Sequence, residues 1–409
     1  MIIFGKHDDK TLAQLEAVAE KAKHVALMAD GHLGYIMPIG GIAAYDNLVS
    51  VVGVGFDIGC GNCAIRTNLT LADFTDRHGR TKELNELARE ISTTLSFGVG
   101  RSNKLRDAPV DHGLFVSSDW DAIPSEAREF LRERARIQLG TVGGGNHYVD
   151  VFADEESTIW VGVHFGSRGF GHNVASGFLA LGQGSNWGER VPERETLFAL
   201  DSELGERYWA AMQLAGEYAY VGREYVARKV VQLMGAQPVE TVHNHHNFAW
   251  KETHFGEELI VVRKGATPAF PGQRGFVGGS MGDDAYIIQG ADASDEVDAL
   301  QRQALFSTVH GAGRVMSRSK AKGSKARYNK ATGERRQARD GAITREMLNI
   351  WVKAKGTIVI GGDVDEAPQA YRRLDSVIAA QQGTIDVLHT LRPLVVVMAG
   401  ADIVDPYKD

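Results

Sequence analysis

The chain has 409 residues, of which 43% are hydrophobic and 24% are charged, and its formal net charge is −7. This composition is typical of a globular protein and excludes collagen, coiled coils, disulfide-rich mini-proteins and disordered tails. The most apolar run, at residues 394–401, is too short to span a bilayer, no signal peptide is evident, and the two cysteines cannot form a disulfide framework. We therefore expect a cytoplasmic protein that does not contact a membrane.

Apolar spacing and good helix-forming residues predict several helices along the chain. The region at 194–235 is the longest and is expected to hold one or two helices, and Ser125 is the predicted N-cap of the helix that contains it. The predicted helices cover residues 11–23, 82–92, 125–138, 194–235 and 366–391.

Strands are predicted where short apolar runs are bounded by glycine. Between residues 25 and 66 such runs indicate strands joined by functional loops. Further strands are predicted at 148–152, 159–164, 259–262, 285–289, 357–360 and 394–397. Because no repeat and no Pro/Ser-rich linker divides the chain, and the unusual segments are spread along almost its whole length, we expect one large α+β domain over residues 1–409.

Several Asp, Asn, Cys and His residues lie at the ends of apolar runs, beside glycine or asparagine, where a strand delivers a side chain to an open loop. Asp, Cys and neutral His suit a borderline transition metal. Their spacing matches neither a zinc finger nor HExxH, so buried polar histidines and a metal site both remain open from spacing alone. The residues are Asp57, Cys60, Asn146, His147, His164, His243, His245, His246 and His310.

Two further features have alternative interpretations. Cys60 and Cys63 form a CxxC pair without a second CxxC, so a redox or zinc role is disfavoured. The segment from Arg314 to Arg339 contains ten Lys or Arg and one acid, Glu334. It is either a basic surface that binds an RNA backbone without reading its sequence, or a solvated loop.

The motifs in this chain resemble those of the RtcB family of RNA ligases over about residues 28–400, which leaves 401–409 as a C-terminal extension. The matching segments are MADGHLGYIMPIGG, GFDIGCG, GGGNHYVDV, HFGSRGFGH, HHNF, VVRKGATPAFPG, GGSMG, VHGAGRVMSR, DEAPQAY and LVVVMAG. The resemblance implies an RtcB-type fold, in which mixed sheets are packed with helices and a metal site lies in a central cleft. It further implies an enzyme that joins RNA 2′,3′-cyclic phosphate or 3′-phosphate ends to 5′-hydroxyl ends. It also implies GTP as cosubstrate, two Mn²⁺ ions, a histidine–GMP intermediate, and a role in tRNA splicing or RNA repair. RNA is the implied partner, and an archease-type activator is an additional candidate.

The resemblance also assigns residues to roles. His310 matches the nucleophile, and a neutral imidazole can attack phosphorus without prior loss of a proton. Arg168, Arg314 and Asp30 match other active-site positions. The implied metal ligands are Asp57, Cys60, His147, His164 and His246, with the Cys60 thiolate bridging the two ions. The implied nucleotide-binding residues are Asn146, Tyr148, Asp150, Asn247, Gly279, Ser280, Met281, Gly311, Ala312, Gly313 and Tyr371.

Two departures from the family pattern concern the nucleotide. Ala399 replaces the lysine of a family Lys-Gly pair that contacts guanine, and Ala285 replaces a serine often found near the nucleotide. Loss of a charge-assisted hydrogen bond costs on the order of 1.5–3 kcal/mol, which predicts relaxed guanine selectivity unless Lys408 or another tail residue substitutes. The alternatives are a metal-dependent 2′,3′-cyclic phosphodiesterase that has lost ligation and a non-enzymatic RNA-binding paralogue. The ligase interpretation requires His310 and Cys60 to share one cleft.

Overall fold

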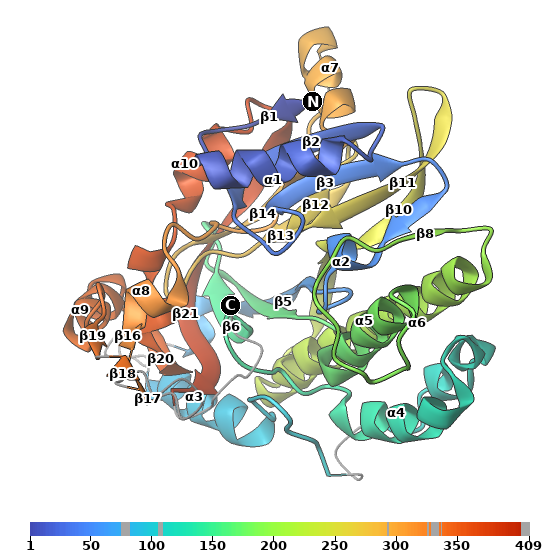
Figure 1. The fold of residues 1–409 in the computed structure, drawn as a ribbon. Helices are drawn as coiled ribbons and strands as arrows, with labels where there is room; N and C mark the ends of the chain where they lie inside the picture. Colours follow the sequence, from blue (N-terminus) through green and yellow to red (C-terminus); the bar gives the residue numbers. More distant parts are fainter. Residues whose placement is uncertain are drawn as a thin grey trace.

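Two β-sheets packed with helices form the framework of the protein (Figure 1). The computed structural model describes residues 1–74, 82–104, 109–292, 294–324, 327–328, 335–336 and 338–401. In sheet order, the five-stranded sheet contains β1 (Ile2–Ile3), β2 (His24–His32), β3 (Ile39–Tyr45), β11 (Glu257–Lys264) and β10 (Asn247–His254). In sheet order, the eight-stranded sheet contains β13 (Arg274–Val277), β14 (Ala285–Gly290), β21 (Ile385–Gly400), β6 (Tyr148–Ala153), β7 (Thr158–Phe165), β5 (Gly61–Thr70) and β9 (Pro238–His245), with β20 (Ile358–Gly362) paired to β21.

The other strands of the described residues form two-stranded pairs. These pairs are β12 (Ala266–Pro268) with β15 (Ser307–Val309), β4 (Leu48–Ser50) with β8 (Leu197–Ala199), β16 (Gly323–Ser324) with β19 (Arg339–Asp340), and β17 (Arg327–Tyr328) with β18 (Arg335–Arg336). The α-helices in the described part of the chain are α1 (Asp9–Ala19), α2 (Val51–Val54), α3 (Lys82–Thr94), α4 (Ser125–Gln138), α5 (Arg168–Gly182), α6 (Glu203–Leu233), α7 (Asp295–Gln303), α8 (Arg318–Lys322), α9 (Arg345–Lys355) and α10 (Leu374–Ala379). None of these described helices is long and apolar enough to cross a membrane.

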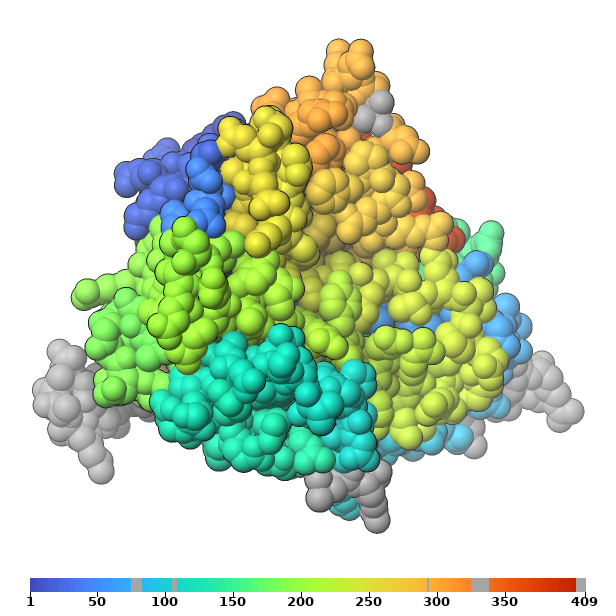
Figure 2. Space-filling model, turned by 90° about the vertical axis from the view of Figure 1, so that its right-hand side faces the viewer, coloured from blue at the N-terminus to red at the C-terminus, as the bar shows by residue number. Residues whose placement is uncertain are grey.

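Helix α6 connects the two main parts of the core. Its 31 residues begin after Ser202, whose side chain accepts a hydrogen bond from the Gly205 N–H and so caps the first turn. Tyr208 and Tyr218 pack into the apolar cluster that α6 shares with α4, α5 and the five-stranded sheet. Val226 and Val230 pack into a second cluster against the eight-stranded sheet. Figure 2 shows the outer side of this helical region, with the teal segment that contains α4 below the green segments and the yellow β10–β11 hairpin above them.

Most predicted elements are present, with shifted ends. Helix α4 has the predicted bounds, but Pro124 occupies the N-cap position and Ser125 is the first helical residue, so the predicted N-cap is wrong by one residue. The first helix begins earlier than predicted, because the Asp8 side chain accepts hydrogen bonds from the N–H groups of the first turn. The region predicted as helical at 194–235 holds the short strand β8 and then one continuous helix, α6.

Two parts of the prediction are wrong. Helix α5 was not predicted because its glycines lower helix propensity, yet they allow close packing: a Cβ on Gly177 would lie 2.5 Å from the Trp187 ring. The helix predicted at 366–391 is largely absent. Two 3₁₀ turns, at Val364–Glu366 and Pro368–Ala370, precede the short helix α10, and β21 begins at Ile385. Pairing with β14 overrides the local helical pattern there.

Candidate active site

Four adjacent strands of the eight-stranded sheet carry four of the predicted metal ligands to one end of the sheet. Cys60 precedes β5, His147 precedes β6, His164 is the next-to-last residue of β7, and His246 follows β9. The strands are antiparallel neighbours, so the start of one lies beside the end of the next. Residues that are far apart in the sequence therefore meet at a single place.

The side chains at this place are spaced as ligands of a shared ion. The Cys60 sulfur lies 3.6 Å from Nε2 of His164 and 3.9 Å from Nε2 of His147. An Asp57 carboxylate oxygen, Oδ2, lies 3.1 Å from the same His147 nitrogen, and the His246 ring lies 5.1 Å from the His164 ring. Two ligands of one transition-metal ion lie roughly 3.5 Å apart, because each bond is about 2.0–2.3 Å long. The sulfur, nitrogen and oxygen donors of this cluster therefore fit a borderline divalent metal.

Hydrogen bonds on the far side of the rings orient two of the histidines. The His147 Nδ1–H donates to the Val142 carbonyl at 3.0 Å, and the His164 Nδ1–H donates to the Asn62 side-chain oxygen at 2.6 Å. Asn62 is held in turn because its Nδ2 donates to the Phe276 carbonyl. The Nε2 atoms of both rings therefore face Cys60, as metal ligation requires, and Nε2 of His147 also lies beside Asp57.

Burial controls protonation in this cluster. It raises the pKa of the Cys60 thiol well above its ordinary value, and it lowers the pKa values of His164 and His246 far below theirs, so both imidazoles are neutral. Burial also tends to raise the pKa of Asp57, but the hydrogen bond and charge of His147 outweigh it and hold that pKa at about 2. Asp57, His164 and His246 are thus already in the states that bind a metal, while the Cys60 thiol would lose its proton to solvent when a cation binds.

His310 lies at the end of a row of rings that begins in this cluster. It follows strand β15, and its ring is 4.9 Å from that of His246. The buried Asp30 accepts hydrogen bonds from the backbone N–H groups of His310 and Gly311, at 3.0 and 3.3 Å. The same oxygen, Oδ2, lies 2.6 Å from Nδ1 of His310, out of line for a hydrogen bond. Asp30 therefore fixes the loop and covers the Nδ1 side of the ring, which leaves Nε2 for chemistry.

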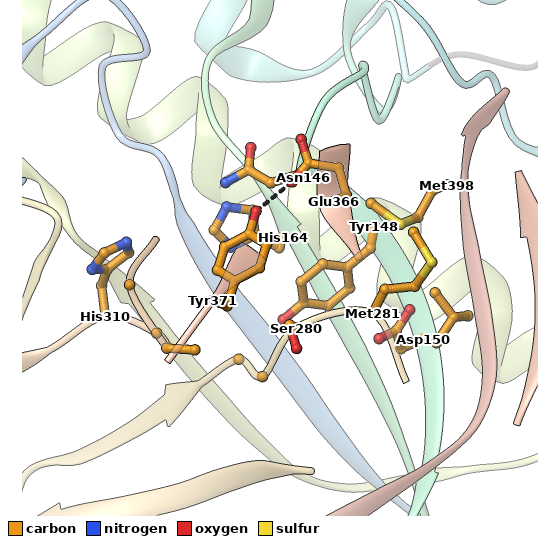
Figure 3. A pocket seen from close by; sticks show the side chains of 16 residues that line it. Asn146, Tyr148, Asp150, His164, Ser280, Met281, His310, Glu366, Tyr371 and Met398 are labelled. Atoms are coloured by element: carbon orange, nitrogen blue, oxygen red, sulfur yellow. Dashed lines mark hydrogen bonds between the residues drawn. The ribbon is translucent and has the colours of Figure 1, made fainter. Parts of the chain in front are cut away.

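A pocket adjoins His310 (Figure 3). Figure 3 shows His310 at one end of the pocket and Asp150, Met281 and Met398 at the other. His164 also lines it, so the nucleophile candidate and the ligand cluster share one cleft. The lining consists of Asn146, Tyr148, Asp150, His164, Gly278, Gly279, Ser280, Met281, His310, Gly311, Ala312, Gly313, Glu366, Tyr371, Val396 and Met398.

The pocket contains buried polar atoms without a partner among the described residues. These atoms are the Tyr148 hydroxyl, Oδ1 of Asp150 and the Ser280 hydroxyl. Burial raises the pKa of Asp150 well above its ordinary value, which favours the protonated form of this carboxyl group. Unpaired buried polar groups are costly, and here they lie beside two methionine side chains. A ligand with a flat apolar face and several polar groups would satisfy the lining.

The two predicted active-site arginines differ in their surroundings. Arg168 adopts a left-handed φ of 58°, and its Nη1 lies 3.2 Å from Nδ1 of His147. Arg314 donates to the Tyr371 hydroxyl at 2.8 Å, to the Glu366 carboxylate at 3.2 Å and to a backbone carbonyl at 2.7 Å. Arg168 thus borders the ligand cluster, whereas the guanidinium of Arg314 supports two residues of the pocket wall.

The cluster HNHHNF divides into a ligand candidate and a scaffold. His243 and His245 contact Arg223 of α6, at 2.9 and 3.0 Å, and burial lowers the pKa of both rings. The fully buried Arg223 also donates to the carbonyls of Gly59 and Phe165, which precede Cys60 and follow His164 respectively. One buried guanidinium therefore ties together three of the segments that carry the predicted ligands.

Asn247 is the one predicted nucleotide-binding residue outside the pocket lining described above. Its side-chain oxygen instead accepts a hydrogen bond from the Gly265 N–H at 2.7 Å. Sequence reasoning missed Glu366, Gly278, Val396 and Met398 as pocket residues, and it missed the supporting roles of Asn62 and Arg223. The motifs DEAPQAY and LVVVMAG contain three of these residues and could have indicated them, but nothing in the sequence relates Arg223 to this site.

The structure places both residues that depart from the family pattern, Ala399 and Ala285, and part of the basic segment. Ala399 lies beside Glu366 in a small second pocket that also contains Asp363 and Asp365, and Ala285 is buried at the start of β14. In the basic segment, Lys320 and Lys322 belong to α8. Lys325, Glu334 and Lys408 lie outside the described residues, as does most of the C-terminal extension.

Comparison with known proteins agrees with this geometry. The model of a family described as tRNA-splicing ligase RtcB matches residues 11–399. The RNA-splicing ligase RtcB of Escherichia coli strain K12 is 32% identical over 400 residues, which cover 92% of this chain and 90% of that protein. The tRNA-splicing ligase RtcB of Nanoarchaeum equitans is 32% identical over 95% of this chain and 92% of its own length, and that of Thermococcus kodakarensis is 30% identical over 94% and 90%. The chain therefore belongs to the RtcB family.

Proposed function

We propose that this protein is a GTP- and Mn²⁺-dependent RNA ligase that acts in tRNA splicing or RNA repair. It joins 2′,3′-cyclic phosphate or 3′-phosphate ends to 5′-hydroxyl ends. The observation that carries the proposal is the continuous row of rings from His164 through His246 to His310, which links a metal-ligand cluster to a pocket that contains unpaired polar atoms. A nucleophile between a cation site and a polar pocket is the arrangement that nucleotidyl transfer requires.

Asp57, Cys60, His147, His164 and His246 would hold two Mn²⁺ ions. When bound, the ions would offset the negative charge of the triphosphate and of the RNA phosphate. The chain itself supplies the orientation of the ligands through Asn62 and the Val142 carbonyl. Arg168, next to His147, adds a cation that can bind phosphate with two parallel hydrogen bonds.

The nucleotide would occupy the pocket with its phosphates toward His310 and its base toward Met281 and Met398. Gly311, Ala312 and Gly313 line the pocket next to His310, at the phosphate end, where the glycines allow close approach of a ligand. Tyr148, Asp150 and Ser280 carry the unpaired polar atoms that the ligand would satisfy. Asn146, Gly279 and Tyr371 complete the proposed binding wall.

The reaction proceeds in three displacements at phosphorus. The His310 Nε2 forms a bond to the α-phosphorus of GTP, and the bond to the bridging oxygen breaks with release of pyrophosphate. An oxygen of the RNA 3′-phosphate then bonds to the same phosphorus and displaces the histidine, which leaves an RNA-3′-pp-5′-G end. Finally, the 5′-hydroxyl oxygen bonds to the RNA 3′-phosphorus and GMP leaves. Asp30 holds the His310 ring in place throughout. A cyclic end is first hydrolysed to the 3′-phosphate.

The proposal is tested by incubation with α-labelled GTP and Mn²⁺, with α-labelled ATP in parallel. We expect a covalent label that is labile in acid and stable in alkali, absent from His310→Ala and present in the control His389→Ala, whose half-buried ring packs on Trp160. Addition of RNA with cyclic-phosphate and 5′-hydroxyl ends should then give a joined product. Opening of the cyclic end without any label would instead establish the phosphodiesterase, and absence of both reactions would refute an enzymatic role.

A further inference from the structure

A partly exposed aromatic cluster, in which Tyr35 is exposed and the other two rings are half-buried, lies next to the candidate metal site, outside the nucleotide pocket. It consists of Tyr35, Phe56 and His172. The Tyr35 ring is 44% exposed and meets the Phe56 ring edge-on at 6.3 Å, and Phe56 lies 5.4 Å from His172. We call these three residues the aromatic platform. Exposed rings that adjoin a functional site indicate a contact surface.

The loop that carries Tyr35 is held in place by its backbone. The Gln14 side chain of α1 donates to the carbonyls of Gly34 and Tyr35, at 2.8 and 2.6 Å, and accepts from the Gly34 N–H at 3.0 Å. The buried Lys264 ammonium lies 5.7 Å from the centre of the Tyr35 ring and covers one of its faces. The ring is therefore supported from the protein side and exposed on the other, as a preformed stacking surface requires.

The platform adjoins both halves of the reaction centre. Phe56 directly precedes Asp57, the carboxylate that contacts His147. Lys264 directly precedes Gly265, and a Cβ placed on Gly265 would lie 3.1 Å from Cε1 of His310. None of the three platform residues belongs to the described lining of the nucleotide pocket. A ligand on the platform would thus reach the metal site and the nucleophile without displacing the nucleotide.

We infer that the aromatic platform stacks an unpaired nucleobase next to the reacting end of the RNA substrate. The inference rests on the proposed function. The pocket takes the base of the nucleotide cosubstrate, so the bases nearest to the RNA ends need a separate surface. Single-stranded RNA bases bind proteins by stacking on aromatic rings without sequence preference. The platform residues carry the flat apolar surface that such a contact needs, beside the place where the phosphate must lie.

Tyr35→Ala tests the inference. Each protein is titrated, with Mn²⁺ and without nucleotide, into a short RNA with a 3′-phosphate end and, separately, one with a 5′-hydroxyl end, each carrying terminal 2-aminopurine. We expect the wild type to quench the 2-aminopurine of one of the two RNAs, which identifies the end that stacks. Tyr35→Ala should bind that RNA about tenfold more weakly and leave its fluorescence unquenched, while Tyr35→Phe should behave as the wild type.

Phe130→Ala is the matched control, because Phe130 is also an exposed ring with a cation, Arg134, near its face. It should bind both RNAs as the wild type does. Equal thermal unfolding of all variants would show that the fold is intact. The wild type should bind an RNA that lacks the terminal base about tenfold more weakly than the complete RNA. Tyr35→Ala should bind this RNA with the same affinity as the wild type does. Unchanged binding by Tyr35→Ala, with the wild type still binding RNA, would overturn the inference alone. A wild type that binds neither RNA would refute the proposed function.

Discussion

A single carboxylate, that of Asp30, fixes the loop of His310, the proposed nucleophile. Asp30 accepts from two backbone N–H groups of the loop and covers Nδ1 of the ring. In Asp30→Asn the amide oxygen can keep the backbone contacts, but the charge beside the imidazole is lost. We expect the rate of covalent labelling to fall about a hundredfold or more, with little change in the GTP concentration that half-saturates it. Rapid-quench labelling measures both quantities. Asp201→Asn, at an exposed position, should label normally, and a loss below threefold in Asp30→Asn would contradict the assigned role.

Asn62 and Asn244 provide a second test at the level of single residues. They are cross-strand partners, and each bonds the backbone of Phe276, but only Asn62 also accepts a hydrogen bond from a predicted ligand, His164. Asn62→Ala should therefore weaken Mn²⁺ binding by about 10–100-fold. Asn244→Ala should lower stability without a comparable loss of metal affinity. Titration followed by electron paramagnetic resonance of free Mn²⁺ measures the affinity, and equal losses in both variants would rule out a specific role for Asn62.

The candidate metal ligands show how much of the site can be predicted from single residues in the sequence. The types of the candidate ligands are visible in the sequence, because Asp, Cys and His at the ends of apolar runs are uncommon. Their division of labour is not visible: of the three histidines in HNHHNF, two contact Arg223 and one faces the ligand cluster. That distinction depends on α6, which passes beneath the strand. A Cβ on its Gly216 would lie 2.5 Å from Phe248, so only glycine permits this approach.

At the level of elements, the hairpin of β10 and β11 contains a buried ion pair. Arg263 is fully buried and donates to both carboxylate oxygens of Glu252, at 2.7 and 2.9 Å. Burial tends to raise the pKa of Glu252, but the charge of Arg263 and a hydrogen bond from His254 hold it at about 2. A pKa that is lower in the folded than in the unfolded state stabilises the fold above the unfolded value of 4.5, and this contribution is lost as the pH falls toward 2.

Glu252→Gln should therefore destabilise the protein by about 3–5 kcal/mol at pH 7, because it leaves Arg263 buried and unpaired. The difference from the wild type should narrow as the pH falls from 4.5 toward 2, where the wild-type carboxylate also becomes protonated. Urea unfolding across this pH range measures the effect. Glu257→Gln, which removes an exposed partner of Lys23 on the same hairpin, should cost no more than about 1 kcal/mol. A pH-independent difference for Glu252→Gln would contradict the ion-pair explanation.

Elements differ in how well local sequence predicts them. Strands β6 and β7 and helix α4 follow their apolar periodicity, so they were predicted nearly to the residue. The first half of β21 was not predicted, because the residues from Leu374 onward have good local helix propensity. Of these residues, only those of α10 form a helix. Sheet pairing is a contact between distant segments, and no local pattern encodes it. The pocket wall formed by Val396 and Met398 depends on the pairing of β21 with β6.

For the molecule as a whole, the predicted metal ligands come from segments spread between residues 57 and 246. Ions bound by these ligands would connect four strands of one sheet, whereas the unfolded chain does not hold the four segments together. Binding should therefore stabilise the whole fold, by about 2.7 kcal/mol when the free ion is at a hundredfold excess over its dissociation constant. Chelation should reverse the effect.

The two cysteines make this prediction specific. Both thiols are buried and lie three residues apart, but only Cys60 is near His147 and His164, whereas Cys63 packs among the apolar residues of the sheet. In Cys60→Ser, a hard hydroxyl replaces the proposed thiolate, so the increase in melting temperature on addition of Mn²⁺ should largely disappear. Cys63→Ser should have a lower melting temperature than the wild type without metal, because a hydroxyl is buried in the core. Its melting temperature should still rise on addition of Mn²⁺ as much as that of the wild type. Scanning calorimetry with and without Mn²⁺ measures all four states. If Cys60→Ser gained as much from Mn²⁺ as Cys63→Ser, the ion would bind elsewhere, and His310 would no longer lie beside the metal that its proposed chemistry needs.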